Sequence, residues 1–234
     1  MTQTHLHTPV SGSTSAHIQT WLVDFDETLA VSHLSWVFQH LFPQFSREHQ
    51  LDYDEGRLHQ VLLVLQERSR QNPDTAQLLA VLFEEMEWPS TLLTQFSLDL
   101  QSSYTPSLFE DSVPFLERLY NSGRHIYIIS NNRHTPKHIQ LFGIDKYIRG
   151  VFTPHNSPDT QPKPHSSLWN YITAHHTDIN PATTVVIGDD PWSDGAFAQA
   201  CSLPCWIVDR TQRFSDMYKQ KPYHWVQSLL DIPI

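Results

Sequence analysis

The residues best suited to chemistry near the start of the chain are two carboxylates, Asp24 and Asp26. They lie at the carboxyl end of a β-branched and aromatic run at residues 20–25. In an extended backbone, side chains repeat every two residues, so both carboxylates would point to the same side. Two like charges this close are costly unless a cation bridges them or one carries a proton. The pattern predicts a charged reaction site or, as the plainer alternative, a capped turn after a strand.

A second acidic group follows the apolar run at residues 184–187. It comprises Asp189, Asp190 and Asp194. Clustered carboxylates suit a hard divalent cation, because such ions prefer oxygen ligands. The alternative is a helix N-terminus whose acidic residues complement the helix dipole, and one of the three could serve only that purpose.

Two further segments carry polar groups that could bind an anion. Ser130, Asn131 and Asn132 follow the run at residues 125–129, and their hydroxyl and amides can bind a phosphoryl oxygen, although they are also common loop residues. Lys163, one of five lysines, stands between two prolines. A rigidly presented ammonium near carboxylates could balance a dianionic substrate, whereas the alternative is a solvent-exposed loop lysine.

The elements that must position these residues are short strands alternating with helices. Five runs predict strands, at residues 20–25, 125–129, 147–152, 184–187 and 205–208. Helical patterns occupy residues 112–120, 136–141, 166–175 and 193–201. This alternation predicts an α/β fold with a doubly wound parallel sheet, in which ligands bind at the carboxyl ends of the strands.

The segment between the first strand and Asp111 has helical periodicity and no convincing strand. Apolar residues at helical spacing occur over residues 34–41, 58–65 and 78–86, which predicts a helical insertion. An aromatic stripe in its first part, including Trp36, Phe38 and Phe42, could line a pocket, but core packing is the more common role of such a stripe. Residues 1–17 have the composition of a flexible leader.

The composition of the chain argues against certain classes of binding partner and predicts where in the cell the protein is found. The 234 residues carry a formal charge of -10, and the lysines are scattered, which argues against a nucleic-acid polymer or a membrane surface as the partner. No run of about 18 apolar residues exists to span a bilayer. Two cysteines without redox or zinc-site spacing, and no apolar signal-like run near the start, predict a cytoplasmic location.

Taken together, the four polar segments resemble the motifs of the haloacid dehalogenase-like hydrolase superfamily. They occur in the superfamily's order and span residues 24–194. The resemblance implies a Rossmann-like catalytic core at residues 18–30 and 109–234, with an inserted α-helical cap domain at residues 31–108.

The same resemblance implies a role for each matching residue. Asp24 would be the nucleophile that forms an aspartyl-phosphate, Asp26 the general acid and base, and Lys163 the group that neutralises charge on both nucleophile and phosphate. The implied phosphate-binding residues are Thr28, Ser130, Asn131 and Lys163. The implied Mg²⁺ ligands are Asp24, Asp26 through its backbone carbonyl, Asp189 and Asp194, while Asp190 occupies a variable position.

The reaction type depends mainly on Asp26. In the superfamily, an acid two residues after the nucleophile favours phosphatase or phosphomutase chemistry over dehalogenase or transport ATPase chemistry. The predicted function is therefore Mg²⁺-dependent hydrolysis of a small phosphomonoester metabolite. The alternatives are a phosphomutase or phosphotransferase on the same core and, in a different class, a catalytically silent binding protein.

The insertion limits the predicted substrate. Residues 31–110 contain four arginines and no lysine, against eleven Asp and Glu. A polyanionic substrate would not be attracted to such a surface. The substrate class predicted here is a small phosphorylated metabolite.

Overall fold

The computed structural model describes residues 17–52, 54, 56–58, 60, 61, 64, 65, 68 and 75–234. The predicted leader lies outside these residues except for residue 17. The chain divides into two compact units, one made of the segment up to Val31 with Ser107–Ile234, and the other of Ser32–Pro106. The sequence analysis places the two boundaries after residues 30 and 108, whereas the compact units divide after Val31 and Pro106. The assignment of the units as catalytic core and cap stays a prediction.

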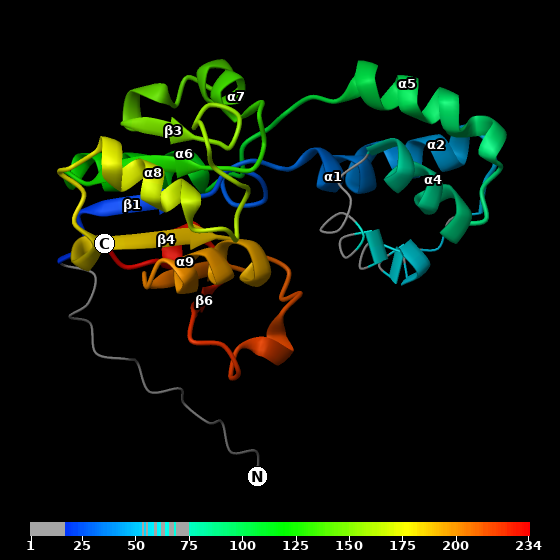
Figure 1. Ribbon diagram of the computed structural model, residues 1–234. Coiled ribbons are helices and arrows are strands. Elements are labelled where there is room, and N and C mark those ends of the chain that lie inside the picture. The colour runs from blue at the N-terminus through cyan, green and yellow to red at the C-terminus, as the bar shows by residue number, and fades with distance from the viewer. Residues whose placement is uncertain are drawn as a thin grey trace, which may run out of the picture. The chain divides into compact units, whose positions relative to one another are not determined.

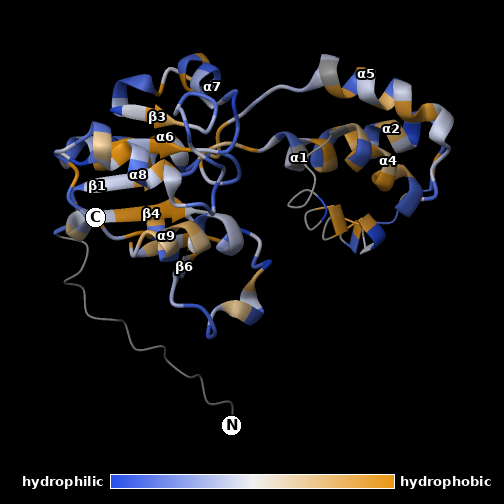
Figure 2. Cartoon of the chain, in the orientation of Figure 1, coloured by the Kyte–Doolittle hydropathy of each residue, from blue (hydrophilic) through white to orange (hydrophobic). Residues whose placement is uncertain are grey.

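The larger unit is built on a parallel sheet of six strands in the order β3-β2-β1-β4-β5-β6. The strands are β1 (Thr20–Val23), β2 (His125–Ile129), β3 (Gly150–Phe152), β4 (Thr184–Gly188), β5 (Cys205–Val208) and β6 (His224–Val226). Strand β4 is buried along its whole length and is one of the most hydrophobic segments (Figure 2). This order, which reverses direction next to β1, is that of a doubly wound sheet.

Helices cover both faces of the sheet (Figure 1). Those of the larger unit are α6 (Ser112–Asn121), α7 (Thr135–Leu141), α8 (Ser167–His175) and α9 (Ala196–Ala200). Alternate residues of β1 face opposite sides, because Val23 packs in the cluster that includes Phe115 of α6 and Leu22 packs in the cluster that includes Phe197 of α9. This alternation follows from strand geometry.

Three strand assignments need correction. The first strand ends at Val23 and does not reach residue 25. The third strand is shorter than residues 147–152, because the 3₁₀ turn Asp145–Tyr147 precedes it and strand pairing begins only at Gly150. Strand β6 is missing from the sequence analysis, since its three residues are too few to show an alternating pattern. The last predicted helix is also divided, because Pro191–Gly195 forms a π-helical turn before α9.

The smaller unit is entirely helical in the residues that the structure describes. Its helices include α1 (His33–Trp36), the π-helical Val37–Leu41, α2 (Phe42–Glu48), α4 (Thr75–Glu85), the 3₁₀ turn Ser90–Leu92 and α5 (Leu93–Ser103), and the described residues from 56 to 68 are helical as well. Phe42 stacks on Trp88 with ring centroids 4.1 Å apart, and Phe45 and Phe96 pack in the same cluster. Phe38 and Phe42 of the predicted stripe are thus core residues. Leu62, of the second predicted apolar face, lies outside the described residues.

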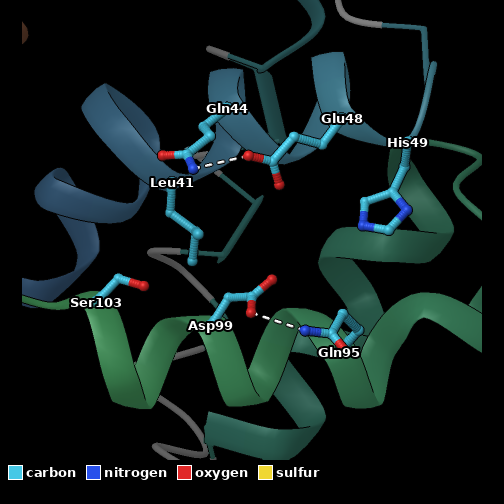
Figure 3. A pocket seen from close by; sticks show the side chains of 7 residues that line it. All are labelled: Leu41, Gln44, Glu48, His49, Gln95, Asp99 and Ser103. Carbon is cyan, nitrogen blue, oxygen red and sulfur yellow. Dashed lines mark hydrogen bonds between the residues drawn. The ribbon is translucent and has the colours of Figure 1, made fainter.

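A cavity of about 280 Å³ lies between α2 and α5 of the smaller unit (Figure 3). Its two carboxylates are already engaged on their own helices: Gln44 donates to Glu48 and Gln95 donates to Asp99, each at 2.8 Å. None of the predicted site residues lines this cavity.

Among the described residues, no helix is long and apolar enough to cross a membrane.

Candidate active site

The site lies where neighbouring strands end at the same edge of the sheet. Val23 of β1 pairs with Ile128 of β2 on one side and with Ile187 of β4 on the other. Asp24, the next residue, donates its backbone N–H to the carbonyl of Ile187 at 2.8 Å. This register places the residues that follow β1, β2 and β4 beside one another, because parallel strands all end at one edge.

Lys163 connects the ends of these strands. Its Nζ lies 2.6 Å from Asp24 Oδ1 and 2.5 Å from Asp194 Oδ1, and it also donates to the carbonyl of Ile129 at 3.1 Å. Only 5% of the residue is exposed, so the alternative of a solvent-exposed loop lysine is wrong. Burial opposes its charge, but Asp194 and Asp24 outweigh burial and raise the pKa of Lys163. The side chain is therefore an ammonium with all three donors in use.

The backbone of Lys163 is held by Asn131. The Lys163 N–H donates to Asn131 Oδ1 at 2.8 Å, and Asn131 Nδ2 donates to the Lys163 carbonyl at 3.1 Å. This amide clamp fixes the lysine loop to the end of β2. The structure thus uses the side chain of Asn131, predicted as a phosphate-binding residue, to position Lys163.

The loop after β4 separates the roles of its three acidic residues. Asp194 Oδ2 accepts the backbone N–H groups of Asp189 and Asp190, each at 3.2 Å. Asp190 instead accepts from Trp192 N at 2.8 Å and Ser193 N at 3.3 Å, which is the arrangement of a helix cap. The alternative of an acidic helix start therefore applies to Asp190, while Asp189 and Asp194 face the buried site.

Asp24, Asp189 and Asp194 form a possible metal site. Each offers a carboxylate oxygen, and the three atoms lie within 4.8 Å of one another. Burial raises the pKa of Asp24 to about 8, and the nearby Asp194 and Asp26 add to this against the opposing effect of Lys163. Burial likewise raises the pKa of Asp189 well above its ordinary value. The three carboxylates offer only hard oxygen donors, and a divalent cation such as Mg²⁺ would supply the positive charge that keeps them ionised, so this residue set fits such an ion.

The carboxylate of Asp26 is not one of these three clustered carboxylates. Its Oδ1 accepts from Asn132 Nδ2 at 3.2 Å. Burial raises the pKa of Asp26, with the hydrogen bond from Asn132 opposing it. A carboxyl group with a raised pKa suits proton transfer near neutral pH. Its predicted role as a metal ligand concerns its backbone carbonyl, and its carboxylate remains available for acid and base chemistry.

Two hydroxyl groups border the nucleophile position. Thr28 is fully buried and its Oγ1 donates to Asp24 Oδ2 at 3.1 Å. Ser130 is also fully buried, and its Oγ accepts from the backbone N–H of Asn132 at 3.0 Å and from Thr135 Oγ1 at 2.9 Å. Because Ser130 Oγ receives two donors, its own proton is left to donate, and Asp26 is one acceptor, since a hydrogen bond from Ser130 lowers the pKa of that carboxyl group.

The sequence analysis misses one charged residue of this site, Arg213. Its Nη2 lies 2.9 Å from Asp189 Oδ2. The loop that carries it is fixed by Asp209, which is fully buried and accepts the backbone N–H groups of Arg213 at 2.9 Å and Phe214 at 2.8 Å. Asp209 directly follows the fifth predicted strand, so a carboxylate at a strand end is the signal that could have pointed to this loop.

A second arginine of the same loop supports the segment that follows β1. Arg210 donates to the Thr28 carbonyl at 2.8 Å and pairs with Asp111 at 2.7 Å. Its guanidinium lies over the ring of Phe109, 4.1 Å from the centroid. Arg210 therefore anchors the turn that carries Thr28, which in turn contacts Asp24.

Comparison with known proteins identifies the family of the chain. The family model of haloacid dehalogenase-like hydrolases matches residues 18–201, and the chain therefore belongs to this hydrolase family. Among proteins with curated descriptions, none matches the sequence.

Solved structures share the fold over nearly the whole chain. The HAD-hydrolase YfnB from Bacillus subtilis bound to magnesium has 14% identity and a TM-score of 0.67, over 92% of this chain and 96% of that one. A HAD family hydrolase from Deinococcus radiodurans with bound phosphate and sodium has 18% identity and a TM-score of 0.70, over 92% and 93%. A HAD phosphatase from Thermococcus onnurineus has 18% identity and a TM-score of 0.57, over 92% and 95%. These similarities confirm the predicted Rossmann-like α/β fold.

The first prediction concerns Gly188, which makes room for Asp194. A Cβ built at Gly188 would overlap the Asp194 carboxyl group. We expect Gly188→Ala to lower the free energy of unfolding by about 1–3 kcal/mol, the usual cost of overpacking, with some excess from disturbing the Lys163 contacts. Urea unfolding measures the loss.

Gly123→Ala is the matched control. Gly123 has a φ of 70° and open space around its Cα, so alanine there carries only the left-handed backbone cost of about 1–2 kcal/mol. A Gly188→Ala variant as stable as the parent, with the expected loss still seen in the control, would contradict the close approach of Asp194.

The second prediction is a pH dependence of stability without metal. The folded-state pKa of Asp24, about 8, exceeds its ordinary value of 3.8, so the folded protein binds more protons than the unfolded chain between these values. The contribution of the Asp24 carboxyl group to the stability of the folded protein is therefore complete below the unfolded-state pKa of 3.8. That contribution is lost as the pH rises through the folded-state pKa of about 8. Asp24→Asn cannot ionise, so its free energy of unfolding should rise relative to the parent from about pH 5 to about pH 8, by at most about 1.4 kcal/mol per pH unit.

Urea unfolding in the presence of a chelator at several pH values measures this difference. Glu84→Gln, at an exposed position of α4 in the other unit, serves as the control and should show a difference from the parent that does not vary with pH. A constant difference for Asp24→Asn would show that the Asp24 carboxyl group is not perturbed by burial.

Proposed function

We propose that this protein is a Mg²⁺-dependent phosphatase that hydrolyses a small phosphomonoester through an aspartyl-phosphate on Asp24. The observation that carries the proposal is the 2.6 Å contact between Lys163 and Asp24 inside a buried group of carboxylates. A carboxylate so placed has its charge partly balanced and yet remains at the open edge of the sheet, where ligands bind in this fold.

In the first step, an oxygen of Asp24 in its ionised form, which a bound cation would favour over the protonated form, attacks the phosphorus of the substrate. The new Asp24–phosphorus bond forms as the bond to the leaving oxygen breaks, and Asp26 gives its proton to that oxygen. Lys163 reduces the repulsion between the carboxylate and the phosphate dianion. The raised pKa of Asp26 supports this step, because it keeps a proton available near neutral pH.

In the second step, water attacks the phosphorus of the aspartyl-phosphate. Asp26, now a carboxylate, accepts a proton from that water, and the bond between phosphorus and Asp24 breaks to release inorganic phosphate. Both displacements are in line, and their acceleration comes mainly from positioning and charge balance. Asp26 ends protonated and ready for the next cycle.

The remaining residues hold the phosphoryl group and the metal. Thr28 and Ser130 supply hydroxyl donors, and Asn131 contributes by holding Lys163 in place. The predicted metal ligands are the carboxylates of Asp24, Asp189 and Asp194 with the backbone carbonyl of Asp26. When bound, Mg²⁺ would supply positive charge that offsets the negative charge on the phosphoryl oxygens in the transition state.

The substrate is proposed to be a small phosphorylated metabolite. Support comes from the acidic composition of the helical unit, which would repel a polyanion. The phosphatase and the bound-phosphate hydrolase among the similar structures agree with phosphate chemistry.

The third prediction tests this function with p-nitrophenyl phosphate and a panel of small phosphomonoesters, with Mg²⁺ or with a chelator. We expect phosphate release that requires Mg²⁺ and that Asp24→Asn abolishes. Asp26→Asn should lower kcat by about 10²–10⁴-fold, the usual effect of losing general acid and base catalysis.

Asp178→Asn, an exposed surface change, should keep the parental rate. Undiminished phosphate release by Asp24→Asn would place the nucleophile elsewhere. A phosphorylated isomer as product, in place of inorganic phosphate, would favour a phosphomutase on the same core.

A further inference from the structure

Arg213 is a cation at the site that has no role in the four sequence motifs. It pairs with Asp189 at 2.9 Å, and its side chain is 31% exposed against 11% for Asp189. It therefore reaches inward from the rim of the site to one of the three buried carboxylates. All of these residues belong to the larger unit.

The loop around Arg213 is built to hold it there. The fully buried Asp209 accepts the backbone N–H groups of Arg213 and Phe214, and also the hydroxyl of Tyr218 at 3.0 Å. The Arg213 guanidinium lies over the ring of Phe214, 4.9 Å from its centroid, and its Nε is 3.8 Å from Asp209 Oδ1. A side chain restrained on several sides loses little further freedom when it pairs with Asp189.

The ion pairs divide the carboxylate group between two cations. Lys163 pairs with Asp24 and Asp194, and Arg213 pairs with Asp189. Each carboxylate of the possible metal group thus has a cationic partner within the chain itself. Three buried negative charges without such partners would oppose folding.

We propose that Arg213 is a built-in counter-ion that competes with the divalent metal for Asp189, stabilising the metal-free protein and weakening metal binding. The inference rests on the proposed Mg²⁺ site. Arg213 acts on the metal site only through its contact with Asp189. A residue that only orients a metal-binding side chain strengthens metal binding. Arg213 is proposed to have the opposite effect and to weaken it.

The sign of the effect follows from charge. A guanidinium in contact with one Asp189 oxygen repels a divalent ion that approaches the same carboxylate. Even with water-like screening, a unit charge about 5 Å from a divalent ion corresponds to about tenfold or more in affinity. Removing the charge of Arg213 should therefore tighten Mg²⁺ binding, while the metal-free protein becomes less stable.

The fourth prediction uses the full chain, treated with a chelator and then titrated with MgCl₂ by calorimetry and by thermal unfolding. We expect Arg213→Gln, which keeps an amide donor but no charge, to have a lower Tm without metal, a larger rise of Tm with Mg²⁺, and a Kd for Mg²⁺ lower by about tenfold or more. Arg213→Lys keeps the charge and should stay within about threefold of the parental Kd.

Arg149→Gln is the matched control, because Arg149 forms an exposed ion pair with Asp178 in the same unit. It should leave the Kd unchanged. With a parent that binds Mg²⁺, equal or weaker binding by Arg213→Gln overturns the counter-ion role, and weaker binding would make Arg213 an orienting group. If no variant binds Mg²⁺, parent included, the proposed metal site fails and this inference fails with it.

Discussion

The structure of the site depends on one interaction, the sharing of the Lys163 ammonium between Asp24 and Asp194. These groups come from three separate parts of the chain, and the ammonium brings two carboxylates together at 2.6 and 2.5 Å. Without a cation between them, buried carboxylates at this spacing would repel each other or take up protons. In the proposed reaction, the same ammonium would also reduce the repulsion between the Asp24 carboxylate and the phosphate.

The fold provides the positions that this interaction needs. Strands β1, β2 and β4 are neighbours, and their register brings Asp24, Ser130 and Asp189 to one edge. Side chains with no proposed part in the reaction fix the loops around this edge. Asn131 accepts a hydrogen bond from the backbone of Lys163, and Asp209 accepts one from the backbone of Arg213. Much of the polar network therefore serves to position a small number of charged groups.

The sequence predicts the strand-end residues well, because a β-branched run followed by a carboxylate or hydroxyl is a local pattern. It also predicts that Lys163 belongs with them, although only the structure shows that the lysine is buried. It does not reveal Arg213, whose pairing with Asp189 depends on the path of a loop with no periodic pattern. Nor does it reveal that Asn131 holds the lysine loop, since an amide can bind a phosphate or a backbone equally well.

The most direct test of the account is a crystal structure of the protein with Mg²⁺ and beryllium fluoride, which mimics a phosphoryl group on a carboxylate. The account predicts a trifluoroberyllate bonded to an oxygen of Asp24, with Lys163 in contact with it and Mg²⁺ on Asp189. Trifluoroberyllate bonded to another residue, or Mg²⁺ bound away from Asp24 and Asp189, would contradict the assignment of Asp24 as the nucleophile of a metal-dependent site.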